Sequence, residues 1–448
     1  PYGRGAQLSL ALALSGELAS GAASPWSPYL QSLPREIQGI PLFWNGGARN
    51  GSQHTQNGSP IEWLNGTEAA KILFDSGDSQ TSLVSEIDEY YEQFAQPVFS
   101  RAFASSPEKI PSLHEFYHAF ALVSSRSFLV DAYQGLCMVP IADAFNHAQE
   151  NHVHLESDFD VCPECGSLQR CLHDDTLQQP VPRSVNPDNA YDSDNFYEMV
   201  SNVAIPPNVE IFNTYGETLS NAQLLVQYGF ILDVNENDCL TWTSTELAQF
   251  SENYLSASGT SWRWNTIGGL SQFNALLGSL TSLPWDSISH SEMVHLDRVQ
   301  PFSLNGDASV SHGLWLYFAL LLCLMTTPLD HHSTNAVVSF LEDLFQRQLA
   351  FEQLLTGEQT PPPVLDDDNI GAAPFSVILE LAGLLALLCR TRAARTGKAG
   401  VQTAELGDML DRLPNDMTPT RMVLSLALTE RSLLDSCVSA WEACASLA

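Results

Sequence analysis

The spacing of apolar residues changes twice along the chain, and these changes constrain the fold more than any other feature. From about residue 7 to 125 the spacing is mostly helical, and Ser112-Leu-His-Glu115 is a capping box that opens an amphipathic stretch ending near Arg126. Short runs of strand character follow, and from about residue 239 leucine and alanine return to helical spacing. The pattern predicts an α+β fold in which a region of short strands is followed by helices.

Three short strands and one helix are expected in the strand region. Leu136–Pro140 is an apolar run with proline at its edge, and Phe196–Val203 and Val209–Thr214 alternate in strand fashion around a Pro-Pro-Asn turn. Ser220–Tyr228 has helical spacing and is followed by Gly229, a residue that readily adopts the left-handed conformation of a helix end.

The length of the chain, 448 residues, exceeds what one hydrophobic core usually organises. We expect one domain over 1–238, with a helical insert at about 7–125 and an acidic insertion at about 150–195, and an all-helical domain over 239–448. Within the second domain, Thr356–Ala373 contains three prolines and three adjacent aspartates and should be irregular.

The chain is strongly acidic, with 52 Asp and Glu against 19 Lys and Arg and a formal net charge of −33. A field of this sign repels nucleic acid and anionic membranes and attracts basic partners such as lysine-rich proteins. An acidic surface also keeps proteins soluble, and composition alone does not separate these two interpretations. We expect a monomer that binds neither nucleic acid nor membrane.

Three apolar runs resemble targeting or membrane segments without fulfilling their requirements. Leu8–Leu14 follows Arg4 as in a short signal peptide, but it is at the lower limit of length and is better explained as the start of a buried helix. Leu314–Met325 and Val377–Cys389 are too short to cross a bilayer, so we expect core helices.

The nine cysteines are an odd number, and most are scattered through apolar or helical contexts. This favours reduced thiols in the cytoplasm or nucleus over a disulfide framework. One group differs, because Cys162, Cys165, Cys171 and His173 lie close together within the acidic insertion. They supply four ligands for a structural zinc ion, but simple free thiols and a redox role are open alternatives.

Two polar sequences follow predicted strands, where functional sites are commonly built. Asp143-Ala-Phe-Asn-His147 places three hydrogen-bonding side chains within five residues, and Tyr215 lies between a strand and a glycine. Taken alone, the first is more often a satisfied turn and the second more often a buried tyrosine with one partner. Their combination with other motifs is more specific.

Five motifs occur in an order and spacing that resemble the SET methyltransferases of the Rubisco large-subunit methyltransferase subfamily, which includes fungal ribosomal-protein lysine methyltransferases. They are Arg126-Ser-Phe128, Val139-Pro-Ile-Ala-Asp-Ala-Phe-Asn-His147, Ile211-Phe-Asn-Thr-Tyr-Gly216, Ser220-Asn221 and Gln227-Tyr-Gly-Phe230. Trp26–Pro34 and Leu64–Thr67 resemble the helical insert of that subfamily, and the helical rear half resembles its substrate-binding domain.

The resemblance implies a role for individual residues. Tyr215 corresponds to the catalytic tyrosine. Asp143, Phe128 and Phe212 correspond to positions near the substrate. The cofactor-binding positions of the family correspond to Arg126, Asn146, His147, Tyr228, Gly229 and Phe230. Gly3-Arg4-Gly5 looks like the Gly-x-Gly motif that opens the cofactor site, but the strands that follow this motif in the family are missing here, and the sequence runs at once into a helical pattern.

The resemblance implies S-adenosylmethionine-dependent methylation of a lysine in a basic protein of ribosomal or histone-like character. Two other functions are compatible with the sequence. The missing strands favour a non-catalytic binding protein with an incomplete cofactor site, and one branch of the family methylates histidine. Tyr228 favours lysine as the target.

Overall fold

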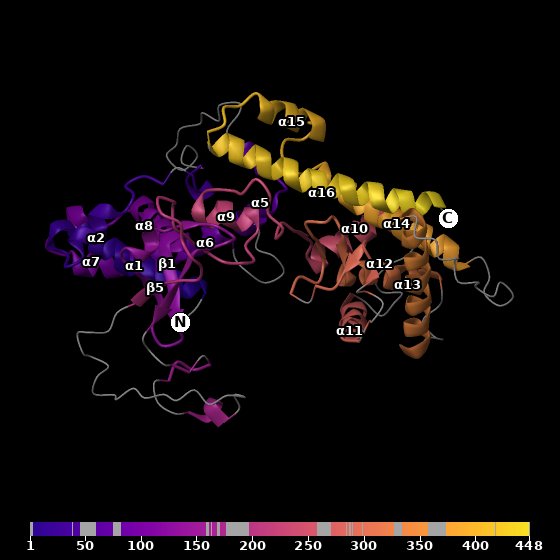
Figure 1. Ribbon diagram of the computed structural model, residues 1–448, viewed down its shortest axis with the longest axis horizontal. Helices are drawn as coiled ribbons and strands as arrows, with labels where there is room; N and C mark the ends of the chain where they lie inside the picture. The colour runs from indigo at the N-terminus through magenta and orange to yellow at the C-terminus, as the bar shows by residue number, and fades with distance from the viewer. Residues whose placement is uncertain are drawn as a thin grey trace. The chain divides into compact units, whose positions relative to one another are not determined.

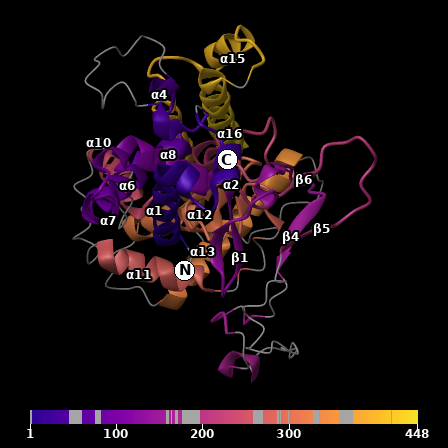
Figure 2. The same ribbon diagram turned by 90° about the vertical axis from the view of Figure 1, so that its left-hand side faces the viewer.

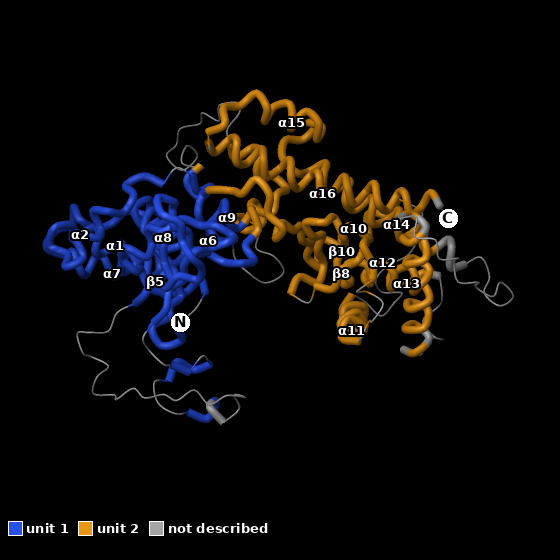
Figure 3. Tube along the Cα trace, in the orientation of Figure 1, with its two compact units in different colours: residues 1–43, 82–219, 223–229 blue, residues 44–81, 220–222, 230–448 orange. Residues whose placement is uncertain are grey.

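The computed structural model describes residues 3–37, 39–44, 60–74, 82–157, 161–162, 164–167, 171–175, 197–257, 270–283, 285, 288, 290–297, 299–326, 334–356, 373–416 and 418–447. The chain forms two compact units, shown in Figure 3. Unit 1 comprises residues 1–43, 82–219 and 223–229, and unit 2 comprises 44–81, 220–222 and 230–448. Among the described residues of the expected helical insert, 60–74 therefore belong to the same unit as the rear half of the chain.

Unit 1 begins with helices that cover a small region of strands (Figure 1). Its α- and π-helical segments are α1 (Arg4–Ser20), α2 (Ser27–Ser32), α6 (Leu83–Tyr90), η3 (Tyr91–Ala95), α7 (Gln96–Ala102), α8 (Leu113–Arg126) and, from residue 223 onward, α9 (Asn221–Tyr228). Short 3₁₀ turns lie at η1 (Gly21–Ala23), η2 (Pro41–Phe43), η4 (Pro107–Lys109), η5 (Ala142–Ala144) and η6 (Leu172–Asp175).

Helices α1 and α8 pack against each other and form the core of unit 1. The apolar start of the chain supplies Leu8, Ala11 and Leu14 to the buried face of α1, as expected for a core helix. The capping box of α8 is present, since Ser112 N–H donates to Glu115 Oε2 at 2.7 Å and Glu115 N–H donates to Ser112 Oγ at 3.3 Å. The helix ends at Arg126, as predicted.

The strands of unit 1 form a hairpin and a small sheet. The hairpin pairs β1 (Ser127–Asp131) with β2 (Gly135–Met138), antiparallel. The sheet has the order β3-β6-β4-β5, and its strands are β3 (Asn146–His147), β4 (Val153–Ser157), β5 (Tyr197–Ser201) and β6 (Phe212–Asn213). The strand expected over Val209–Thr214 is reduced to β6, because only Phe212 and Asn213 have neighbours in the sheet. Figure 2 shows β4 and β5 side by side.

Unit 2 is built mainly from helices. They are α4 (Pro60–Trp63), α5 (Glu68–Phe74), α10 (Ser244–Ala257), α11 (Leu270–Thr281), α12 (His312–Thr326), α13 (Thr334–Thr356), α14 (Ala373–Ala393), α15 (Thr403–Asp411) and α16 (Pro419–Leu447). The two apolar runs are core helices as predicted, since Leu314 in α12 and Leu381 in α14 are fully buried. Among the described helices, none is both long enough and apolar enough to cross a membrane.

The all-helical expectation for the rear half is wrong in one respect. Four strands of two residues each form a sheet of order β7-β9-β10-β8. They are β7 (Leu240–Thr241), β8 (Val294–His295), β9 (Ser303–Leu304) and β10 (Val310–Ser311). Alternation with a period of two is not recognisable in two residues, so the pattern did not reveal them. The predicted irregular segment Thr356–Ala373 lies, apart from its two end residues, outside the described residues.

A buried group of charges holds α5 in unit 2. Glu68 accepts hydrogen bonds from Arg392 Nη2 at 2.9 Å and from the N–H and hydroxyl of Thr241, both at 2.8 Å. Its own N–H donates to Glu430 Oε1 at 2.9 Å. The backbone also approaches closely here, because a Cβ on Gly66 would lie 2.4 Å from the carbonyl oxygen of Arg395. The contacts of Glu68 with Arg392 and Glu430 join residues more than 300 positions apart.

Glu430 makes the stability of unit 2 depend on pH between about 4.5 and 8. Burial raises the pKa of its carboxyl to about 8, and the negative charge of Glu68 adds to the rise while Arg392 opposes it. The folded chain therefore keeps a proton that the unfolded chain loses near its ordinary pKa of 4.5, and the free energy of unfolding falls as pH rises between these values.

Glu430→Gln removes this ionisation and keeps the acceptor for Glu68 N–H. We expect the variant to be more stable than the unmutated chain at pH 8, by about 1–3 kcal/mol, and nearly equal to it at pH 5. Denaturant unfolding at both pH values measures the difference. A stability difference that is the same at pH 5 and pH 8 would contradict the assignment.

Candidate active site around Tyr215

A parallel strand pair in unit 1 brings two of the predicted motifs together. Asn146 of β3 is paired with Phe212 of β6, and His147 with Asn213. Tyr215 follows β6 by two residues, so it emerges at the same end of the sheet as His147. Its backbone N–H donates to His147 Nδ1 at 3.1 Å, which fixes the turn after β6 on the histidine ring.

The Tyr215 side chain is held from three sides. Its hydroxyl donates to the carbonyl oxygen of Phe145 at 3.0 Å. Its ring stacks on that of Tyr228, with centroids 4.5 Å apart, and lies 5.2 Å from the ring of His147. The structure therefore places three predicted site residues in one aromatic group, at the end of α9 and beside β3.

Burial keeps both tyrosine hydroxyls protonated. It raises the pKa of Tyr215, where the negative charge of Asp143 adds to the rise and Arg126 opposes it. It raises the pKa of Tyr228 to about 12, with the neighbouring Tyr215 adding to the shift. At neutral pH both hydroxyls are therefore protonated, and that of Tyr215 donates to Phe145.

Arg126 and Asp143 form a second polar group with a residue whose role the motifs did not indicate. Arg126 Nη1 donates to the backbone carbonyl of Asp143 at 2.9 Å and lies 3.5 Å from its carboxylate. Tyr29 of α2 donates its hydroxyl to the same carboxylate at 2.9 Å. Burial, followed by the charge of Asp143, raises the pKa of Tyr29, so it remains a donor. Tyr29 lies within the Trp26–Pro34 motif, the one sequence signal that could have revealed it.

The loop that carries Asp143 begins with a strained residue. Ile141 has φ 75° and is 81% exposed. A β-branched residue rarely adopts this conformation, and such strain is concentrated at functional sites. The turn η5 follows directly and presents Asp143 to Arg126.

Asn146 lies at the exposed edge of this group. Its side-chain amide donates to Glu210 Oε1 at 2.5 Å, a contact that the motifs did not predict. Phe212, expected near the substrate, is half-buried and its ring lies 5.7 Å from that of His152. Phe128, also expected there, is half-buried in β1 opposite Cys137.

The other predicted cofactor positions have visible backbone roles. Gly229 has φ 77° and closes α9, and a Cβ on it would lie 2.8 Å from the carbonyl carbon of Gly39. Phe230 is half-buried and belongs to the next segment of unit 2. Gly3 has φ 76° and precedes α1, while Gly5 lies in the first turn of that helix. The cofactor role of all four residues stays a prediction, and for Gly3 and Gly5 it would involve a helix start in place of a loop.

Asn221, the second residue of the Ser-Asn motif, has a structural role. It is buried, and its side chain donates to the carbonyl of Leu232 at 3.0 Å and to Asp238 Oδ2 at 2.9 Å, while its Oδ1 accepts from Leu232 N–H at 2.8 Å. Asn221 therefore fixes the chain that follows α9.

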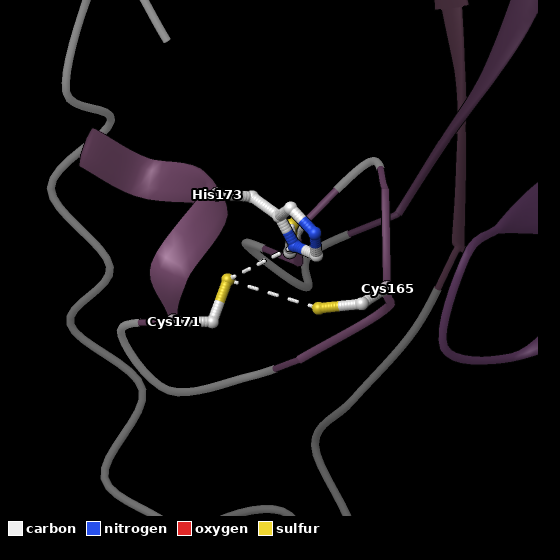
Figure 4. A group of neighbouring side chains, drawn as sticks. Cys165, Cys171 and His173 are labelled. Atoms are coloured by element: carbon white, nitrogen blue, oxygen red, sulfur yellow. Dashed lines mark hydrogen bonds between the residues drawn. The ribbon is translucent and has the colours of Figure 1, made fainter. Parts of the chain in front are cut away.

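The cysteines and histidine of the acidic insertion lie apart from the Tyr215 group in the sequence and converge on one another. The ligand atoms of Cys162, Cys165, Cys171 and His173 all lie within 4.8 Å of one another. Three of these side chains are labelled in Figure 4, which shows them pointing toward a common centre. Burial alone would raise the pKa of Cys162, but N–H groups of Cys165 and Glu164 bound to its sulfur lower it to about 6.

A cavity of about 790 Å³ lies within unit 2 and contains none of the predicted site residues. Its walls come from α5, α10 and α14, and they include the basic side chains Lys71, Arg392 and Arg395 beside Glu246. Lys71 and Arg392 both form ion pairs with Glu246, at 3.1 and 3.6 Å.

The hydrogen bond from Tyr215 N–H requires His147 Nδ1 to be unprotonated. Burial lowers the pKa of His147 below its ordinary value of 6.5, so the ring is neutral and carries its proton on Nε2. The unfolded chain binds the proton more readily, and this contribution to stability is therefore lost as pH falls below 6.5. In ¹⁵N–¹H spectra of the histidine rings, His147 should titrate below pH 6.5 from the Nε2–H tautomer. A titration midpoint above 6.5 would contradict the contact.

No protein-family model matches the chain. Ribosomal lysine N-methyltransferase 3 of Saccharomyces cerevisiae is 30% identical over 167 residues, which are 28% of this chain and 30% of that protein. The chloroplastic Rubisco large-subunit N-methyltransferase of Nicotiana tabacum is 23% identical over 307 residues, which are 66% of this chain and 50% of that protein. The chain thus spans half or less of the length of these two relatives.

Among solved structures, Rubisco LSMT bound to AdoMet superposes with a TM-score of 0.50 at 16% identity, covering 97% of this chain and 74% of that one. The similarity extends over both units. The chain therefore has a SET-domain fold of the Rubisco large-subunit methyltransferase type, which confirms the resemblance predicted from its five ordered motifs.

Proposed function

We propose that the chain is an S-adenosylmethionine-dependent protein-lysine N-methyltransferase. The observation that carries the proposal is the neutral Tyr215 hydroxyl, fixed on the Phe145 carbonyl between the rings of His147 and Tyr228. Relatives with the same fold support it, since LSMT has been solved with lysine and AdoHcy and the yeast relative is named a ribosomal lysine methyltransferase.

The side chains around Tyr215 fit the chemistry of S-adenosylmethionine. The cofactor has a carboxylate, which suits the Arg126 guanidinium, and the bonds from Arg126 to Asp143 come from one of its three nitrogens. It has polar groups that suit the Asn146 amide at the exposed edge of β3. It has a positively charged sulfur, which suits the stacked faces of Tyr215 and Tyr228. When bound, it supplies an electrophilic methyl group on that sulfur.

The residues of the chain orient the lysine amine and remove it from water. A free lysine has a pKa of about 10.4, and only the neutral amine has the lone pair that forms the new N–C bond. Removal of the amine from water, beside a positively charged sulfur, disfavours the ammonium form. Tyr215 does not accept its proton, because the pKa of this hydroxyl is raised and its own proton is bound to the Phe145 carbonyl. The role of Tyr215 is to position the amine.

The substrate we propose is a basic protein, with a ribosomal protein as the favoured class. The net charge of −33 attracts lysine-rich surfaces and raises their local concentration around the chain. The same field disfavours nucleic acid as a substrate.

A second function is favoured by one observation. Gly5 of the Gly-x-Gly sequence lies in the first turn of α1. The backbone N–H groups of this sequence therefore follow a helix and do not form a loop around a ligand. A chain with this start could hold a basic partner without transferring a methyl group. Cofactor binding separates the two functions.

The purified full chain should bind S-adenosylmethionine in calorimetry and transfer a radiolabelled methyl group to a basic protein fraction. Tyr215→Phe removes the hydroxyl and keeps the stacked ring, so the transfer rate should fall about 100-fold or more, as for the loss of one oriented hydrogen-bonding group. The dissociation constant of the cofactor should change by less than about threefold, because the ring contacts persist.

Tyr90→Phe is the matched control. Tyr90 lies in α6 of unit 1 and stacks on Phe116, so the substitution removes one hydroxyl from a ring whose stacking is retained. Its transfer rate should equal that of the unmutated chain. If Tyr215→Phe lowers the transfer rate and the cofactor affinity equally, Tyr215 does not act by positioning the amine. If the unmutated chain does not bind the cofactor, the methyltransferase function is contradicted and only the binding-protein function is left.

A further inference from the structure

We propose that Cys162, Cys165, Cys171 and His173 bind one zinc ion, and that this ion fastens the acidic insertion to the turn between β1 and β2. The site is structural and separate from methyl transfer. It therefore stands or falls independently of the proposed function.

The distances between the ligand atoms match a tetrahedral site. Cys165 Sγ lies 3.7 Å from Cys171 Sγ, and His173 Nδ1 lies 3.7 Å from both Cys162 Sγ and Cys171 Sγ. Zinc–sulfur bonds of about 2.3 Å and a zinc–nitrogen bond of about 2.0 Å place tetrahedral ligand atoms about 3.5–3.8 Å apart. These three ligand pairs already have this spacing, and all four ligand atoms lie within 4.8 Å of one another.

The backbone around the first two cysteines forms a tight turn. Cys162 N–H donates to the Ser167 carbonyl at 3.0 Å, and Gly166 N–H donates to the Cys162 carbonyl at 2.8 Å. Within this turn, the N–H groups of Glu164 and Cys165 donate to the Cys162 sulfur, and that of Ser167 donates to the Cys165 sulfur. Such contacts to the ligand atoms fix the orientation of the two cysteine side chains.

The turn is docked on the β1–β2 hairpin through Gly166. This glycine has φ 70°, and a Cβ on it would lie 2.4 Å from the carbonyl oxygen of Ala132 and 2.9 Å from the N–H nitrogen of Tyr133. Only glycine permits such a close approach of the two backbones. The hairpin turn is itself rigid, because Asp131 Oδ1 accepts from Tyr133 N–H at 2.8 Å and from Gln134 N–H at 2.6 Å.

The turn between β1 and β2 is also bonded to the sheet that precedes Tyr215. Asp131 Oδ2 accepts from the hydroxyl of Ser157, the last residue of β4, at 2.9 Å. The β4 strand pairs with β6, which precedes Tyr215. The zinc site would therefore fix the point at which the insertion leaves the sheet.

A metal would add stability to the described part of the insertion. Among its described residues, Cys162 is buried, whereas Leu172, a large apolar side chain next to a ligand, is 87% exposed. A segment without an apolar core folds only if another interaction compensates its loss of entropy, and structural zinc does this in small domains.

Two rival states fit the geometry less well. A disulfide requires about 2.05 Å between sulfurs, and joining Cys165 to Cys171 would leave Cys162 and His173 without a shared function. A catalytic zinc requires an open position, whereas four protein ligands here complete the tetrahedron.

Metal analysis of the full chain, purified without chelators under reducing conditions, tests the proposal. We expect one zinc ion per chain in the unmutated protein. His173→Ala should lower the zinc content at least tenfold, whereas His173→Cys should retain zinc, because four thiolates also form a tetrahedral site. Cys239→Ser is the matched control, since it removes a thiol of unit 2 and should leave the zinc content unchanged.

Limited proteolysis provides a second readout that does not depend on metal analysis. Chelation of the unmutated chain should increase cleavage within residues 158–196 at least tenfold, and added zinc should reverse the effect. The same treatment should leave the cleavage pattern of His173→Ala unchanged. A reduced, folded chain without zinc, or a Cys165–Cys171 disulfide in the native protein, would overturn the proposal, as would full zinc content in His173→Ala.

Discussion

The parallel pairing of β3 with β6 is the contact on which the candidate active site depends. Each strand has two residues, and the pairing joins positions about 65 residues apart in the sequence. It places His147 beside the turn that carries Tyr215, and the hydrogen bond between them completes the arrangement. A contact this short has little stability of its own, so the helices around it and the longer β4–β5 pair must hold it in place.

The chemistry of the group follows from its burial. The two stacked tyrosines remain neutral because burial raises the pKa of each, and His147 remains neutral because burial lowers its pKa. The neighbouring Arg126–Asp143 pair carries no net charge, and Tyr29 supplies the carboxylate with a further donor. A neutral, aromatic group on an otherwise acidic chain suits a reaction in which a basic side chain is attracted by the surface and loses its charge at the site.

Local signals revealed those parts of the fold that local interactions determine. The capping box predicted the start of α8 and Gly229 the end of α9, since each feature satisfies backbone groups within a few residues. The motif order predicted the Tyr215 group through family resemblance, because neither Tyr215 nor Asn146 is distinctive alone.

The remaining features depend on distant contacts. The packing of α5 in unit 2 rests on Glu68, Arg392 and Glu430, and no local pattern predicts that these charges meet. Tyr29 reaches Asp143 across 114 positions. A structural zinc ion was one of three interpretations that the sequence left open for the cysteines and histidine of the insertion. The short distances between their ligand atoms in the folded chain are what favours zinc.

We infer that the Tyr215 group positions a lysine amine for methylation. Tandem mass spectrometry of a basic protein fraction incubated with the chain and S-adenosylmethionine tests this inference. New methyl groups are expected on lysine Nε atoms, and they should be absent when Tyr215→Phe replaces the unmutated chain. Methyl groups on histidine, or unmodified proteins despite measured cofactor binding, would contradict it.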